Sequence, residues 1–84
     1  MNTRVVAFRE EGTWVAQCLD IDVCVSAPNL SRLWNVLDLM LFAERHLASE
    51  LGQSLPGPAP LKFHELWAND ACVVKKIVRV PDEA

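Results

Sequence analysis

The alternation of apolar and polar positions in the first third of the chain predicts three short β-strands. Residues 4–9, RVVAFR, are rich in β-branched and aromatic side chains, which favour a strand. Residues 13–19, TWVAQCL, follow the period of two that puts alternate side chains on opposite faces of a sheet. Between them, EEGT contains Gly12, which can take the positive φ of a tight hairpin turn. With a third strand at residues 23–26, VCVS, these segments are expected to form an antiparallel meander.

The hydrophobic period then changes to that of a helix. Pro28 ends the third strand, and Asn29 or Ser31 can cap a helix by accepting hydrogen bonds from its free N–H groups. Over residues 30–51 the apolar positions recur with the spacing of a helix that lies on a sheet, and Gly52 is placed to end it. The stripe comprises Leu33, Trp34, Leu37, Met40, Leu41, Leu47, Ala48 and Leu51, with Glu44 at its centre.

The last third of the chain predicts a connector, a short helix and one more strand. Residues 53–60, QSLPGPAP, contain three prolines and a glycine and cannot form regular structure. A short helix is expected at residues 60–69 and a fourth strand at residues 71–80, which Pro81 ends. The expected fold is therefore a single α+β domain over residues 1–84, in the order β-β-β-α-short α-β, with the long helix on one face of an antiparallel sheet.

Part of the long helix, VLDLMLFAE at residues 36–44, is apolar on nearly every side. Stepping about 100° per residue from Leu37, at the centre of the sheet-facing stripe, places Leu39 and Phe42 near the back of the helix. Two explanations stay open: the short helix at 60–69 folds over this back, or another chain covers it, because exposed apolar patches mark interaction sites. A homo-oligomer is expected, since both faces of the sheet are also apolar. The predicted interface residues are Leu39, Phe42, Ala43 and Trp67.

Composition and charge narrow the classes of partner. Half of the residues are hydrophobic (51%), and the net charge is -3. Apart from Lys75-Lys76, predicted to guard a sheet edge, no lysines are adjacent, so direct DNA binding is not expected and a basic partner is favoured. The apolar runs are too short to cross a membrane. Three cysteines without a CxxC pair and without a signal-like start predict a cytoplasmic protein without a disulfide framework.

No catalytic or metal-binding pattern emerges from the cysteines and histidines. Cys18 and Cys24 fall on neighbouring strands, and Cys72 begins the last one. His46 and His64 lie on different elements, too far apart in sequence for zinc-ligand spacing. Each cysteine is expected to be a small buried apolar residue, and each histidine a solvated or half-buried side chain.

The acidic residues leave one enzymatic alternative. Asp20, Asp22 and Glu44 could together bind a divalent metal for nuclease chemistry. The two aspartates are, however, what a turn uses, because their side chains bond to nearby backbone. No catalytic residue, cofactor or metal is therefore predicted, and the chain is expected not to be an enzyme.

The segment VVAFREEGTWVAQCLDIDVCVSAPNLSRLWNVLDLMLF resembles the HicB family, the antitoxins of bacterial toxin–antitoxin pairs. The resemblance rests on the first strand, the EEGTWVAQCLDIDV hairpin, a small polar step before the helix, and one long helix. It covers residues 4–45 best, and PLKFHELW is similar to a short segment of some members. SAPN stands where the family commonly has a glycine before the helix.

The resemblance implies a β-β-β-α-β core related to RNase H but lacking its catalytic acids. It also implies binding to a small basic toxin that cleaves messenger RNA. Many members add a C-terminal DNA-binding module, whereas this sequence ends at RVPDEA, so DNA repression by this chain alone is not expected. An orphan HicB-like domain with a structural or small-ligand-binding role is the alternative.

Overall fold

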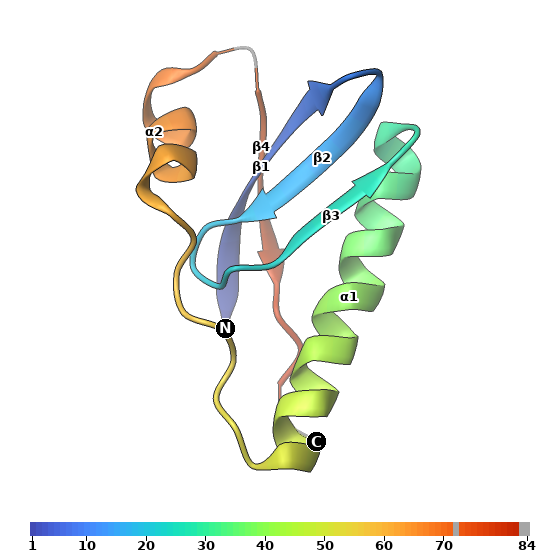
Figure 1. Cartoon of the computed structure of the whole chain (residues 1–84), viewed down its shortest axis with the longest axis vertical. Coiled ribbons are helices and arrows are strands. Elements are labelled where there is room, and N and C mark those ends of the chain that lie inside the picture. The colour runs from blue at the N-terminus through green and yellow to red at the C-terminus, as the bar shows by residue number, and fades with distance from the viewer. Residues whose placement is uncertain (72, 83–84) are drawn as a thin grey trace.

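A computed structural model describes residues 1–71 and 73–82. Its elements are, in chain order, β1 (Asn2–Glu10), β2 (Thr13–Cys18), β3 (Cys24–Ala27), α1 (Leu30–Leu51), α2 (Leu61–Asn69) and β4 (Val74–Arg79). Figure 1 shows the twisted sheet with α1 along one side and α2 on the other. The α+β class and the predicted element order are confirmed. Of the predicted fourth strand, Cys72 lies outside the described residues.

The four strands form one antiparallel sheet in the order β3-β2-β1-β4. The first three strands are neighbours, which confirms the predicted meander, and Val5 pairs with Cys18 and Ala16 with Val25. β4 pairs antiparallel with β1, with Val5 opposite Lys76. The direction of β4 follows from the connector and α2: α1 runs the length of the sheet once, and the chain returns through residues 52–60 and α2 before β4 begins (Figure 1). Lys75 and Lys76 therefore lie on an edge strand, where the sequence placed them.

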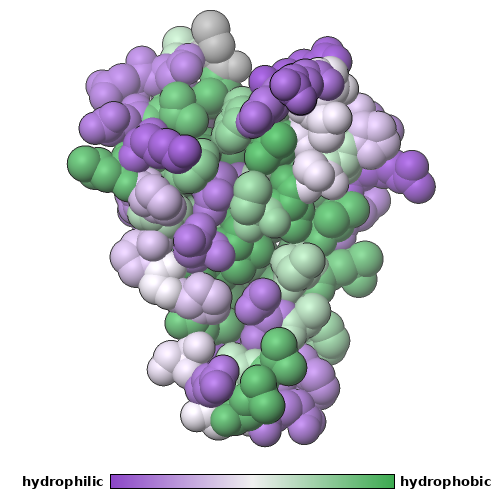
Figure 2. Space-filling view, viewed as in Figure 1, coloured by the Kyte–Doolittle hydropathy of each residue, from purple (hydrophilic) through white to green (hydrophobic). Residues whose placement is uncertain are grey.

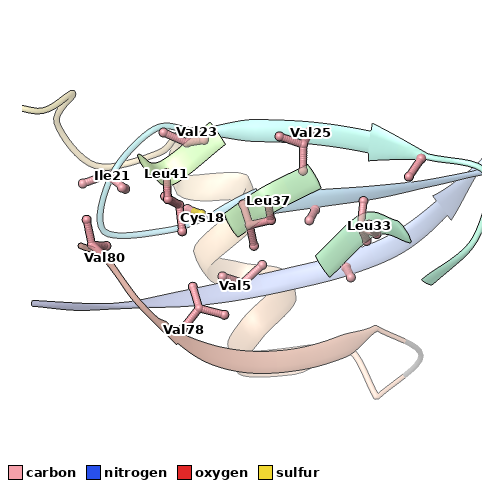
Figure 3. Packing of buried hydrophobic residues seen from close by; sticks show 13 residues of the cluster. Val5, Cys18, Ile21, Val23, Val25, Leu33, Leu37, Leu41, Val78 and Val80 are labelled. Carbon is pink, nitrogen blue, oxygen red and sulfur yellow. The ribbon is translucent and has the colours of Figure 1, made fainter. Parts of the chain in front are cut away.

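The main core lies between α1 and one face of the sheet. Leu33, Leu37 and Leu41 point from α1 to the strands, and Figure 3 shows them over Val5 and Val25. Their i, i+4, i+8 spacing keeps them on one side of the helix. Asn29 caps α1, because its side-chain oxygen accepts a hydrogen bond from the Arg32 N–H at 2.9 Å. The predicted helix, its Asn29 cap and the stripe positions Leu33, Leu37 and Leu41 are confirmed. Met40, which was also predicted to face the sheet, is exposed.

The second face of the sheet is covered in part by α2. The rings of Phe8 and Phe63 stack there, with centroids 6.4 Å apart. Alternation along β1 places Phe8 on the face opposite Val5 and Ala7, hence opposite α1. The connector follows the β2–β3 loop, where Ala59 N–H donates to the Leu19 carbonyl at 3.0 Å. The interpretation that the short helix folds over the back of the long helix is therefore wrong: α2 covers the far face of the sheet.

The C-terminal half of α1 extends past the ends of the strands (Figure 1). A helix of 22 residues is about 33 Å long, whereas a strand the length of β2 reaches only about 20 Å. Leu47 and Leu51, predicted to face the sheet, are consequently 54% and 58% exposed. Ala48 stays buried, and Gly52 ends the helix at φ 65°, as predicted.

Candidate functional site

The outward side of α1 carries large apolar side chains that the described residues leave open to solvent. Leu39 is 72% exposed and Phe42 is 62% exposed, and Ala43 beside them is exposed as well. We call Asn35, Leu39, Phe42 and His46 the outer face of α1. Figure 2 shows apolar residues at the surface along the margin that α1 occupies in Figure 1. The sequence prediction of an apolar back to this helix is confirmed, and its role as an interface stays a prediction.

Phe42 stacks on a neighbour of the same helix and lines a hollow beside the C-terminal segment. Its ring stacks on that of His46 at 6.3 Å with an interplanar angle of 4°. Arg45 Nε donates to the Pro81 carbonyl at 2.9 Å and ties the chain after β4 to α1. A hollow of about 70 Å³ lies here, lined by Phe42, Arg45, His46, Ser49, Pro81 and Asp82. The arrangement presents an aromatic ring beside a shallow polar-rimmed hollow, which suits a protein contact better than a small ligand.

Asp82 places a carboxylate at the edge of this hollow, which Arg45 also lines. Its carboxylate accepts a hydrogen bond from Arg79 at 3.1 Å and lies 3.7 Å from the N-terminal ammonium. The hydrogen bond from Arg79 is the main reason why the pKa of Asp82 is lowered, and the terminal ammonium adds to the effect. The carboxylate is thus charged at neutral pH.

Trp67 lies on α2 and not with the other three predicted interface residues. Since α1 and α2 cover opposite faces of the sheet, Trp67 does not join Leu39, Phe42 and Ala43 in one surface. Sequence reasoning grouped them because it placed α2 over the back of α1. In the structure Phe63 of α2 stacks on Phe8 of the far face, a contact between residues remote in sequence that the periodicity does not reveal.

A second concave region lies between α2 and the far face of the sheet. It has a volume of about 390 Å³ and is lined by Phe8, Glu10, Val15, Cys24, Lys62, Phe63 and Leu66. Most of the lining is apolar, and its two charged residues are Glu10 and Lys62. The ammonium of Lys62 lies 5.0 Å from the Phe63 ring centroid. Sequence analysis did not find this cavity, because its walls come from four elements whose pairing the periodicity does not reveal.

The two described cysteines face opposite sides of the sheet. Cys18 is buried against α1, and burial raises the pKa of its thiol to about 12. Cys24 is exposed at the edge of the far-face cavity, so the prediction that each cysteine is buried is wrong for it. Partial burial also raises the pKa of Cys24, and the nearby Asp22 and Glu10 carboxylates add to that shift. Both thiols are therefore protonated at neutral pH and weak nucleophiles.

Asp20 and Asp22 are engaged within the fold. Asp20 accepts from the Arg4 backbone N–H and from its guanidinium, both at 2.8 Å. The hydrogen bond from the Arg4 side chain is the largest cause that lowers the pKa of Asp20. Asp22 accepts a hydrogen bond at 3.0 Å from Gln17, a buried side chain of β2. Both aspartates lie in the connection between β2 and β3, as predicted, but their carboxylates accept hydrogen bonds from Arg4 and Gln17 and not from the adjacent backbone.

The remaining candidates do not converge. Glu44 lies on α1, whereas Arg4, which pairs with Asp20, has its side chain on the opposite face of the sheet. His64 hydrogen-bonds through Nε2 with the Ala59 carbonyl at 3.2 Å, and His46 lies 3.7 Å from Glu50 on the same helix. Among the described residues, no three His, Cys, Asp or Glu side chains come together in a way that could hold a metal ion.

The chain matches no family model, no curated protein and no solved structure. Within residues 1–71 and 73–82, no helix is both long and apolar enough to cross a membrane. The surfaces described above therefore carry the functional interpretation.

Proposed function

We propose that this chain is a non-enzymatic, cytoplasmic protein-binding domain that acts as a HicB-type antitoxin and neutralises a small basic toxin. The observation that carries the proposal is the outer face of α1, where the side chains of Leu39 and Phe42 are mostly exposed to solvent. Large exposed apolar side chains on a small domain mark a protein contact, and an aromatic anchor is typical of its centre.

Three further features support a protein partner over a reaction. The carboxylates of Asp20 and Asp22 accept hydrogen bonds from Arg4 and Gln17, and among the described residues no three His, Cys, Asp or Glu side chains come together. The described thiols have raised pKa values. The net charge of -3 favours a basic partner. The strand meander and the long helix agree with the element order that the HicB resemblance implies. The added helix α2 stands between α1 and β4, and β4 pairs antiparallel with β1.

Capture from the source cell tests this proposal. The tagged chain should retain a small basic protein at equal stoichiometry, and adding the chain to that protein should stop it from cleaving RNA. The double variant Leu39→Asn/Phe42→Asn should lose the partner. Ile77→Asn, which alters an apolar side chain 62% exposed on β4, is the matched control and should keep it. Recovery of the same partner by the double variant would refute the assigned surface, and the absence of any basic partner would refute the antitoxin role.

The far-face cavity favours a second candidate function, the binding of a small apolar ligand. Its volume of about 390 Å³ falls within the range of about 300–1,000 Å³ typical of ligand pockets, and most of its lining is apolar, with Lys62 and Glu10 as its charged residues. Titration with anilinonaphthalene sulfonate, an aromatic sulfonate dye, tests this role. Val15→Phe should fill the cavity and abolish binding, whereas Leu39→Asn should not change it. Equal binding by wild type and Val15→Phe would show that the cavity is not a ligand site.

A further inference from the structure

The far-face cavity between α2 and the sheet has an apolar floor and a charged rim. Half-buried apolar side chains from β1, β2 and α2 form the floor, namely Phe8, Val15, Phe63 and Leu66. The two charged residues of the lining, Glu10 and Lys62, are both exposed and therefore lie at the rim. A ligand that matches this arrangement has its charged groups at one end and its apolar part at the other.

The two charges of the rim belong to different walls of the cavity. Lys62 lies in the first turn of α2, with its ammonium 5.0 Å from the Phe63 ring centroid. Glu10 is the last residue of β1, and its carboxylate contributes to the raised pKa of the Cys24 thiol on β3. The carboxylate is therefore close to the strand side of the cavity, and a positive and a negative group face the same space from two sides.

Neither of these charges is neutralised by a neighbour within residues 1–71 and 73–82. The ion pairs in this part of the chain join other groups, and Glu10 and Lys62 do not pair with each other. Both charges border one small cavity, so both are available to a single bound molecule.

The opposite signs of the two charges select among ligand classes. A fatty acid would place its carboxylate near Lys62 but also near the Glu10 carboxylate, and an apolar amine would meet the reverse conflict. A zwitterion offers the opposite charge to both residues. The volume of about 390 Å³ is near the lower end of the range of about 300–1,000 Å³ for ligand pockets, which favours a molecule of amino-acid size over a long acyl chain.

We propose that the far-face cavity binds a free α-amino acid with a large apolar side chain. Its ammonium group lies against Glu10 and its carboxylate against Lys62. Its side chain packs on the rings of Phe8 and Phe63. This inference rests on the second candidate function, the binding of a small ligand in the same cavity, and names the class of that ligand. Because both charged residues are exposed, each ion pair is weak and screened by salt, so affinity should fall as ionic strength rises.

NMR titration of the isotope-labelled chain at low salt tests the class with three ligands that share a phenyl ring. Phenylalanine carries both charges, phenylpropionate lacks the ammonium, and phenethylamine lacks the carboxylate. Phenylalanine should bind about threefold more tightly than either analogue, since each analogue loses one exposed ion pair. The amide signals that shift should include those of Val15 and Leu66, which line the floor.

Substitutions at the rim should affect the three ligands in different directions. Glu10→Gln and Lys62→Gln should each weaken phenylalanine by about threefold. Glu10→Gln should instead strengthen the binding of phenylpropionate, and Lys62→Gln should strengthen that of phenethylamine, because each removes a like charge. Glu11→Gln and Lys75→Gln are the matched controls: both change exposed charges outside the lining and should leave all three affinities unchanged.

The outcomes separate this inference from the function on which it rests. Phenylalanine that binds no more tightly than either analogue, or that is unaffected by both rim substitutions, would overturn the assignment to amino acids. If anilinonaphthalene sulfonate then still binds to wild type and not to Val15→Phe, the cavity is a ligand site of another class. If neither phenylalanine nor the dye binds, the amino-acid site and the second candidate function are both refuted.

Discussion

Single side chains in this protein have roles that their sequence neighbours do not reveal. Asp20 looks like an ordinary turn residue beside Asp22, yet it pairs with Arg4, sixteen residues earlier on another strand. Cys24 looks like a strand residue to be buried, yet it lies on the exposed side of an edge strand. Both depend on which strands become neighbours. Residue type alone predicted the turn and the strand, but not the partners.

The Arg4–Asp20 pair should make stability depend on pH in the acid range. Because the pKa of Asp20 is depressed in the folded state, its contribution is present above the ordinary value of 3.8 and is lost as pH falls through the depressed pKa. Asp20→Asn should lower Tm by about 5 °C at pH 7. The gap to wild type should close below pH 4, as followed by thermal unfolding at several pH values. A constant gap from pH 7 to pH 2 would contradict the role of the charge.

Gly52 should tolerate no side chain without a loss of stability. Its φ of 65° is the left-handed conformation, in which an alanine costs about 1 kcal/mol. Gly52→Ala should therefore lower the free energy of unfolding by about that amount, measured with urea. Gly57→Ala is the control, because Gly57 does not have a left-handed φ and there is open space around it. This substitution should change stability by less than about 0.5 kcal/mol. Equal effects of the two would contradict this reading of the helix end.

At the scale of elements, α1 has one side buried against the sheet and one apolar side exposed to solvent. Its period predicted both the sheet-facing stripe and the apolar back, and the structure confirms both. The period could not show where the sheet ends, so Leu47 and Leu51 were assigned to the core although α1 extends past the strands. The short helix was likewise predicted as an element, but its position on the far face depends on the Phe8–Phe63 contact, which is remote in sequence.

Two leucines separated by one residue should therefore respond very differently to truncation. Leu37 is fully buried between α1 and the sheet. Leu37→Ala should lower the free energy of unfolding by about 3 kcal/mol because it leaves a cavity in the core. Leu39→Ala, on the outer face, should cost less than about 0.5 kcal/mol. Urea unfolding of the two variants measures the difference. Similar losses would mean that Leu39 is covered within the monomer, and the outer face would not be available to a partner.

At the scale of the whole molecule, two surfaces have separate proposed roles. The outer face of α1 is assigned to a protein partner, and the far-face cavity to a small ligand as the alternative. The α+β class and the antiparallel sheet were predictable from the sequence. The pairing of β4 with β1 and the cavity were not, because both depend on the path that the connector and α2 take across the sheet.

Hydroxyl-radical footprinting of the chain in an extract of its source cell tests the central claim, that the outer face of α1 binds another protein. Labelling at Phe42 and Leu39 is compared with that of the purified chain at the same concentration. Leu61, which is 72% exposed on α2, serves as the internal reference. The account predicts at least a severalfold loss of labelling at Phe42 and Leu39 with Leu61 unchanged. Equal labelling in extract and buffer would contradict it.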